Sequence, residues 1–162
     1  MAENAPSPGL AIERIYLKDA SFESPRAPAV FRSEWQPQIH IDINTKNNAL
    51  GEDRHEVVLA LTLTAKVDGE SLLIIELQQA GIFRITGLTD DPLRQALAVA
   101  CPNILFPYAR EAIDSLASRG TFPAFNLAPI NFDALYAEAK RRHEAEISSG
   151  TDPSGAGERF VN

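Results

Sequence analysis

Residues 57–69 read Val57-Val-Leu-Ala-Leu-Thr-Leu-Thr-Ala-Lys-Val-Asp-Gly69, and this stretch decides the fold class. Every second side chain is aliphatic, which is the two-residue period of a β-strand with one buried face. The terminal Asp68-Gly69 pair favours a tight hairpin turn, and residues 72–85 then repeat the alternation. The pattern predicts a long hairpin with strands at residues 53–67 and 72–85.

Two further strands are predicted upstream of this hairpin. Ile39, Ile41 and Ile43 alternate with polar residues, as in a half-buried strand. Residues 10–22 form the first of four strands, although the adjacent charges Glu13-Arg14 break its alternation. That break indicates a bulge or an edge position.

The segment between the first two strands, residues 24–37, contains three prolines. The three prolines are expected to forbid a regular element, but Val30, Phe31 and Trp35 need an apolar surface, so we expect an ordered crossover. Strands of roughly twelve to fifteen residues exceed the usual length of about five or six. Because one small chain covers such a sheet poorly, we also expect oligomerisation.

The second half of the chain predicts a long helix with a break. Asp91-Pro92 indicates an N-cap followed by proline at the first helical position. We expect Pro102 to stop or kink the helix and Pro107 to lie in the first turn of its continuation, which ends near Arg119-Gly120.

A final helix is predicted after the proline-containing loop at residues 121–129. Asn131 is its expected N-cap, and its apolar stripe runs out near Ile147. Residues 148–162 lack periodicity and are expected to form a disordered tail, as residues 1–9 are expected to form a flexible N-terminal segment.

Composition excludes several classes of protein. The chain has 162 residues, 44% of them hydrophobic, which suits one globular domain. Its net charge of -7, of which -6 falls in residues 1–91, argues against nucleic acid and favours a basic partner. A single cysteine, no signal-like start and no long apolar run predict a cytoplasmic protein that does not insert into membranes.

The sequence offers no catalytic motif. Cys101 lies in an apolar helical stripe without a suitably spaced histidine, which favours a buried structural thiol. There is no G-x-S-x-G elbow, P-loop or G-x-G-x-x-G. His40 and His55 are expected on the wet face of neighbouring strands, and a third metal ligand is hard to name.

Two surface features allow two interpretations each. Asp19, Glu23 and Glu76, with Ile74 beside them, are either a solvated sheet face or an acidic docking patch for a basic partner. The aromatic residues in or beside loops either cap the core or line a groove for extended apolar peptide. They are Phe22, Phe31, Trp35, Phe122 and Phe125.

Several stretches over about residues 10–140 together match one pattern. They are Ile15-Tyr-Leu-Lys-Asp-Ala-Ser-Phe-Glu-Ser-Pro25, Phe31 with Trp35-Gln-Pro37, Glu56-Val-Val-Leu59, Gln78-Gln-Ala-Gly-Ile-Phe83, Cys101-Pro-Asn-Ile-Leu-Phe-Pro-Tyr-Ala-Arg-Glu111, Arg119-Gly-Thr-Phe-Pro123 and Leu127-Ala-Pro-Ile-Asn-Phe-Asp-Ala-Leu-Tyr136. With these stretches the chain resembles one family, the SecB protein-export chaperones of bacteria.

This resemblance implies an α+β fold in which a four-stranded antiparallel sheet carries two main helices, the first broken at Pro102. It implies a chaperone domain at residues 10–147 and a homotetramer built as a dimer of dimers. It also implies no enzymatic activity and no cofactor or metal. A chaperone of this kind binds unfolded precursor proteins without ATP, keeps them competent for translocation and delivers them to the SecA motor.

The resemblance also assigns site residues. SecA, through its basic zinc-holding C-terminal tail, would dock on Asp19, Glu23, Ile74 and Glu76. The client grooves would be lined by Trp35, Ile39, Ile41, Ile43, Phe122, Phe125 and Leu127. Two alternatives remain open: a SecB-like chaperone dedicated to an antitoxin, and a small acyl-processing enzyme with a buried acid or histidine in an apolar cavity.

Overall fold

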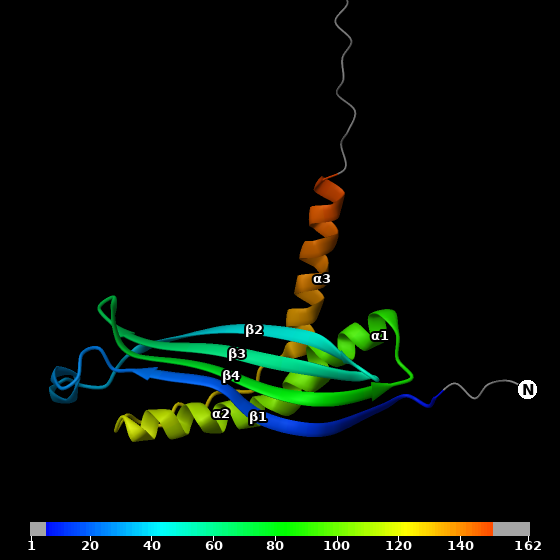
Figure 1. Cartoon of the computed structure of the whole chain (residues 1–162). Helices are drawn as coiled ribbons and strands as arrows, with labels where there is room; N and C mark the ends of the chain where they lie inside the picture. The colour runs from blue at the N-terminus through cyan, green and yellow to red at the C-terminus, as the bar shows by residue number, and fades with distance from the viewer. Residues whose placement is uncertain (1–5, 151–162) are drawn as a thin grey trace, which may run out of the picture. The chain divides into compact units, whose positions relative to one another are not determined.

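The computed structural model describes residues 6–150 of the chain. It contains a four-stranded antiparallel sheet of β1 (Gly9–Glu23), β2 (Gln38–Gly51), β3 (Arg54–Val67) and β4 (Glu70–Thr86). The strands lie side by side in the order β1-β4-β3-β2 (Figure 1). Tight turns join β2, β3 and β4, and the crossover after β1 returns the chain to the far edge, which gives a Greek-key arrangement. The predicted α+β class is confirmed.

The turn between β3 and β4 has the predicted hairpin geometry. Asp68 and Gly69 both have positive φ angles, 49° and 79°, and Val67 pairs with Glu70 across the turn. This is the left-handed backbone that a two-residue turn needs to match the twist of its strands.

Strand β1 is an edge strand with two irregularities. Its register against β4 shifts between Ile12 and Arg14, which confirms the bulge predicted at Glu13-Arg14, and shifts again between Leu17 and Asp19. Each extra residue reverses which side chains face the helix layer.

The crossover contains a regular element that the prolines were expected to forbid. A short 3-10 helix, η1 (Ala29–Arg32), buries Val30. The expectation was wrong because Pro25, Pro28 and Pro37 lie outside these four residues, so every residue of the turn keeps its backbone N–H.

The helical run after the sheet continues through Pro102. It consists of α1 (Asp90–Gln95), a widened π turn η2 (Ala96–Ala100) and α2 (Cys101–Arg119). The break therefore precedes Pro102: the Cys101 N–H bonds to the carbonyl of Ala96, five residues back. The wider turn accommodates a proline ring that would clash with a carbonyl in a regular helix.

Two details of this run differ from expectation. The N-cap is Thr89, and Asp91 lies inside α1, where the aspartates of the first turn interact favourably with the helix dipole. Pro107 is in the interior of α2 rather than in a first turn, because the helix already begins at Cys101. The predicted end at Arg119-Gly120 is confirmed.

The close approach of two aromatic rings explains why glycine follows α2. Gly120 has an ordinary φ of -84°. A Cβ atom there would lie 2.2 Å from Cζ of Phe22 and 2.9 Å from Cδ2 of Phe122. Any side chain would therefore force the two rings or the end of α2 to shift.

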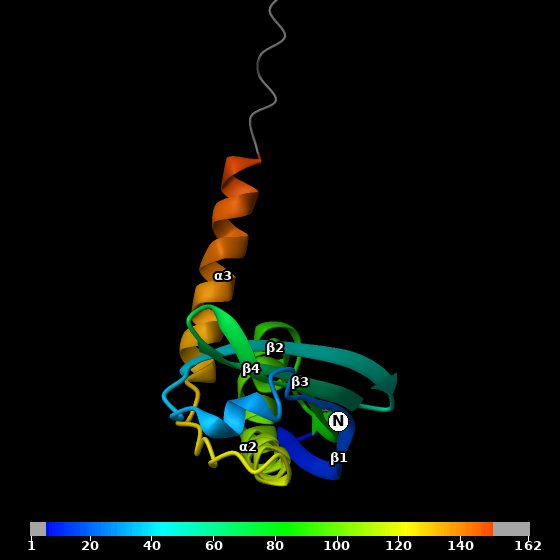
Figure 2. The same ribbon diagram turned by 90° about the vertical axis from the view of Figure 1, so that its left-hand side faces the viewer.

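The core lies between α2 and the face of β3 and β4 that we call the inner face (Figures 1 and 2). On β3, Leu59, Leu61 and Leu63 are at most 1% exposed. Cys101 is also fully buried, as predicted, and burial raises the pKa of its thiol to about 12. The thiol is therefore protonated at neutral pH and is a poor nucleophile.

The chain forms two compact units that divide between Ile130 and Asn131. The second unit is α3 (Phe132–Ser149), whose predicted cap is confirmed: Oδ1 of Asn131 accepts a hydrogen bond of 3.0 Å from the Ala134 N–H. The helix continues two residues into the segment expected to be a tail.

The rest of that predicted tail, residues 151–162, lies outside the described residues, as do residues 1–5 of the predicted N-terminal segment. Within residues 6–150, none of the helices combines the length and the apolar character needed to cross a membrane.

Candidate functional site

The acidic residues singled out from the sequence share one face of the sheet. Asp19 pairs with Gln78, and Glu23 pairs with Ile74 two residues away from Glu76 on β4. Residues directly opposite each other on antiparallel strands point to the same side. Asp19, Glu23, Ile74 and Glu76 therefore form one acidic patch on the outer face, the face of the sheet opposite α2.

The bulge at Lys18 makes this patch possible. Leu17 pairs with the buried Gln79 on the inner face, and without an extra residue Asp19 would follow it there. The bulge turns Asp19 outward and Phe22 inward. The sequence contains a signal of it, because Leu17 and Phe22 are both apolar but have opposite parity along the strand.

The register adds an acid from the opposite edge of the sheet. Asp42 on β2 pairs with Thr62, which pairs with Glu76. The row crosses all four strands, since Glu76 is opposite Ser21 on β1. Sequence reasoning missed Asp42, because the row depends on the pairing of strands that are distant along the chain.

The two histidines lie far apart on the β2–β3 pair. His40 is opposite Thr64, whereas His55 is opposite Ala49 near the other end. His40 Nε2 lies 3.3 Å from Asp42 Oδ1, and both side chains are exposed. Among residues 6–150, no three His, Cys, Asp or Glu side chains gather in a way that could hold a metal ion.

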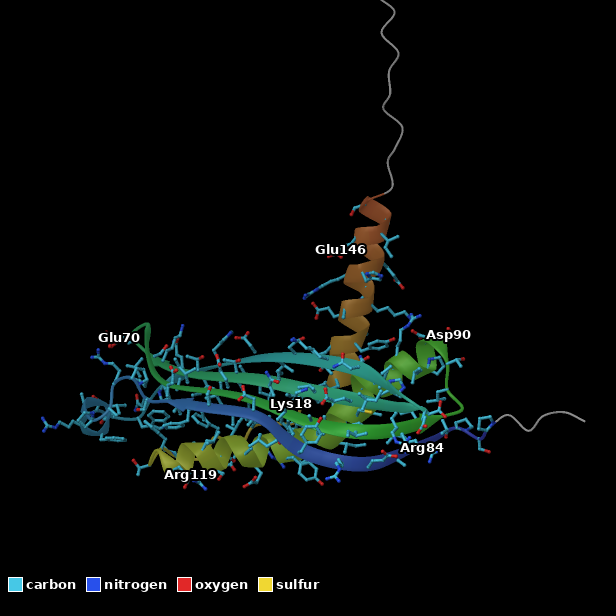
Figure 3. All side chains as sticks on the ribbon, viewed as in Figure 1. Lys18, Glu70, Arg84, Asp90, Arg119 and Glu146 are labelled. Atoms are coloured by element: carbon cyan, nitrogen blue, oxygen red, sulfur yellow. The ribbon has the colours of Figure 1, made fainter. Side chains whose placement is uncertain are left out.

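Beyond Asp19 along the outer face, one acid is paired with donors. Glu56 accepts hydrogen bonds from the Tyr16 hydroxyl and, at 2.9 Å, from Lys18 Nζ. These bonds hold the pKa of Glu56 below its usual value, and the bond from Tyr16 has the largest effect. Burial raises the pKa of Tyr16 to about 12. Figure 3 shows Lys18 between Glu70 and Arg84, which lie at opposite ends of the sheet.

The acids of the patch differ from Glu56. Within the described part of the chain, Asp19, Glu23 and Glu76 are exposed and make no ion pair. Their charges are therefore available to a basic partner.

The isoleucines of β2 form an apolar strip along the edge of the inner face. Ile39, Ile41 and Ile43 pair with Ala65, Leu63 and Leu61, so both sets point to the inner face. The β3 partners are buried, while Ile39 is 42% exposed and Ile41 and Ile43 are half-buried. The strip remains accessible because α2 packs on β3 and β4.

An aromatic cluster joins the crossover to the loop after α2. Trp35 lies with its ring centroid 5.1 Å from that of Phe122 and 6.3 Å from that of Phe125. Phe22 and Phe31 also lie near Phe122, with ring centroids 6.3 and 5.6 Å from that of Phe122. The cluster thus unites residues from β1, the crossover and the loop.

Exposure divides the proposed client residues into two groups. Phe122 and Leu127 are buried, whereas Trp35 and Phe125 are partly exposed. Sequence reasoning could not separate them, since both groups are apolar loop residues. It also missed Asp114 of α2, whose Oδ1 accepts hydrogen bonds from the backbone N–H groups of Phe125, at 2.8 Å, and Asn126, at 3.3 Å.

Comparison with known proteins gives the family. The family model described as preprotein translocase subunit SecB matches residues 3–143. The protein-export protein SecB of Hahella chejuensis is 56% identical over 90% of this chain and 94% of that protein. The protein of the same name from Pseudomonas fluorescens is 53% identical over 91% of this chain and 93% of its own length.

A solved structure has the same fold at low identity. It is a SecB-like chaperone of Mycobacterium tuberculosis in complex with a peptide from an antitoxin, with a TM-score of 0.63 and 20% identity over 75% of this chain and 90% of that one. The high-identity relatives are named for protein export, and their family is one of chaperones rather than enzymes. The chain belongs to the SecB family of protein-export chaperones.

Proposed function

We propose that this chain binds unfolded precursor proteins in apolar grooves without ATP, keeps them competent for translocation and delivers them to the SecA motor. The observation that carries the proposal is the accessible strip of Ile39, Ile41 and Ile43 beside the covered centre of the inner face. Folded proteins normally bury such a strip, and an extended apolar chain matches it in shape and chemistry.

The aromatic cluster supports the same role. The partly exposed Trp35 lies against the buried Phe122 and the partly exposed Phe125. Burial of apolar area depends weakly on sequence, so these surfaces suit many clients. A client that folds quickly hides its own apolar segments, and slow-folding precursors are therefore selected.

For SecA, we propose docking on the acidic patch through the motor's basic, zinc-holding tail. The patch presents the exposed carboxylates of Asp19, Glu23 and Glu76 on the face of the sheet that Ile74 shares. Complementary charge attracts and orients a basic segment, and the zinc belongs to the partner.

We further propose that four chains assemble as a dimer of dimers in the cytoplasm, with residues 10–147 acting as the chaperone domain. Leu10, Ile12 and Leu17 on the edge strand β1 and Leu135 on α3 are exposed in the single chain. An edge strand with exposed apolar side chains favours association.

Of the alternatives, dedication to an antitoxin is disfavoured. The antitoxin-bound structure is only 20% identical to this chain, whereas export proteins are 51–56% identical. The acyl-processing enzyme is disfavoured as well, because the family to which this chain belongs consists of chaperones rather than enzymes.

Light scattering tests the proposal most directly. The purified protein should have the mass of a tetramer and form a larger complex with a slow-folding precursor diluted from denaturant. A monomer that does not bind the unfolded precursor would overturn both the assembly and the client-binding proposals. Capture of one small protein, with no binding of unrelated precursors, would instead favour the dedicated chaperone.

A further inference from the structure

We propose that Asp114 is a positioning residue for client recognition, because its carboxylate holds the loop at residues 121–130 so that Phe125 stays against Trp35. The inference rests on the proposed client-binding function. In this inference, a polar residue of α2 fixes the position of an apolar surface that contacts the client.

Two successive turns at the end of α2 form hydrogen bonds with the loop. The Phe122 N–H donates to the carbonyl of Ala117 at 3.0 Å. One helical turn earlier, Asp114 Oδ1 accepts from the N–H groups of Phe125 and Asn126. The loop therefore runs back along the helix that precedes it, and Asp114 is its second point of attachment.

The two attachments hold different aromatic residues. The first fixes Phe122 through a backbone carbonyl, which no side-chain substitution removes. The second fixes Phe125 through a side chain, at a point where Asn126 has a positive φ of 48°. After glycine, asparagine is among the residues that adopt left-handed backbone most readily, and the Asp114 carboxylate bonds to the N–H groups at this turn.

Removing the Asp114 carboxylate should therefore affect one aromatic residue and not the other. Loss of the Asp114 carboxylate should release Phe125 from Trp35 and leave Phe122 in place, because Phe122 is buried and separately bonded. The partly exposed side of the cluster would then lose its fixed shape. A preorganised surface binds more tightly, since less conformational entropy is lost on binding.

The chain provides its own reporter. Trp35 is the single tryptophan, and it touches the two aromatic residues in question. We would compare Asp114→Ala with Asp114→Asn, which keeps an Oδ1 acceptor, and with Glu111→Ala, which removes a carboxylate from an exposed position of the same helix.

In Asp114→Ala without client, Trp35 emission should shift to the red and the Phe125 amide should exchange about tenfold faster, with the Phe122 amide unchanged. Affinity for an unfolded, aromatic-rich precursor segment should fall about fivefold. Affinity for an unfolded aliphatic segment should fall by a smaller factor. Asp114→Asn should keep emission, amide exchange and client affinity close to those of the unaltered protein. Glu111→Ala should change none of these three.

Three results would overturn the inference. Unchanged emission and exchange in Asp114→Ala would remove the positioning role, and changed emission with unchanged client affinity would remove its link to recognition. Equal defects in Asp114→Asn and Asp114→Ala would assign the effect to charge. Failure of the unaltered protein to bind any precursor would count against the proposed function, while the emission and exchange measurements would still decide the positioning role.

Discussion

The two faces of the sheet come from the same strands but differ in almost every property. On the inner face, side chains such as Leu61 are buried beneath α2, and apolar side chains stay accessible along the edge strands β2 and β1. On the outer face, Glu76 and Asp42 are exposed acids, and Thr62 between them is polar and half-buried. Alternation along each strand therefore gives one thin layer two chemically opposite surfaces, and an apolar client and a basic partner need not compete for either.

The largest difference between the faces should appear in stability. Leu61→Ala removes buried methyl groups beneath the helix and should lower the free energy of unfolding by about 3 kcal/mol. Thr62→Ala, next along β3 and on the outer face, should cost less than about 1 kcal/mol. Urea denaturation measures both, and comparable losses would mean that the outer face is also packed.

A second test concerns the accessible strip. Ile41→Ser combined with Ile43→Ser should weaken binding of an unfolded precursor by about thirtyfold, because two apolar contact residues are lost. SecA affinity should change little. The matched control is His40→Ser with Asn44→Ser, which alters the opposite side of the same strand.

Titration calorimetry or fluorescence anisotropy would measure both affinities for this double variant. If precursor and SecA binding fell equally, the substitutions would have unfolded the protein, and the strip would lose its assigned role.

Charge reversal tests the outer face. Glu76→Lys should weaken SecA binding about tenfold at low salt and leave precursor binding intact, since a like charge then faces the basic tail. The defect should shrink as salt screens the charges. Glu111→Lys on α2 makes the same charge change away from the patch, and an unchanged SecA affinity in Glu76→Lys would contradict the docking site.

The smallest effect is expected at the paired acid of the outer face, Glu56. Tyr16→Phe removes the first cause of the lowered Glu56 pKa, so that pKa should rise toward its usual value of 4.5. Stability at neutral pH should fall by about 1 kcal/mol. NMR titration of Glu56 measures the first change and urea denaturation the second.

The pH dependence of this effect has a definite sign. A carboxyl whose pKa is lower in the folded state stabilises the fold above its unfolded pKa, and this stabilisation is lost as the pH falls through the folded value. The difference between Tyr16→Phe and the unaltered chain should therefore narrow below about pH 4.5. Tyr108→Phe, at an exposed position, should show neither change.

Local patterns in the sequence were sufficient for the strands, the hairpin turn at Asp68-Gly69, the bulge at Glu13-Arg14 and the cap at Asn131. Each depends on neighbouring residues only. The helix was harder: proline chemistry indicates a distortion near Pro102, but whether the chain stops or widens its turn depends on the sheet beneath it.

The sequence by itself determined which side chains share a face, because side-chain direction follows from the period of a strand. It thereby placed Glu76 beside Ile74 and separated Ile41 from Asp42. It also determined the charge excess of the first half of the chain.

Only the tertiary structure decided which strands are neighbours and what covers them. The second bulge, at Lys18, brings Asp19 to the side of Glu76, strand order adds Asp42 to the same row, and folding of the loop onto α2 puts Asp114 beneath Phe125. The physical reason is that these contacts join residues far apart along the chain, so they exist only once the sheet and the helix have packed together.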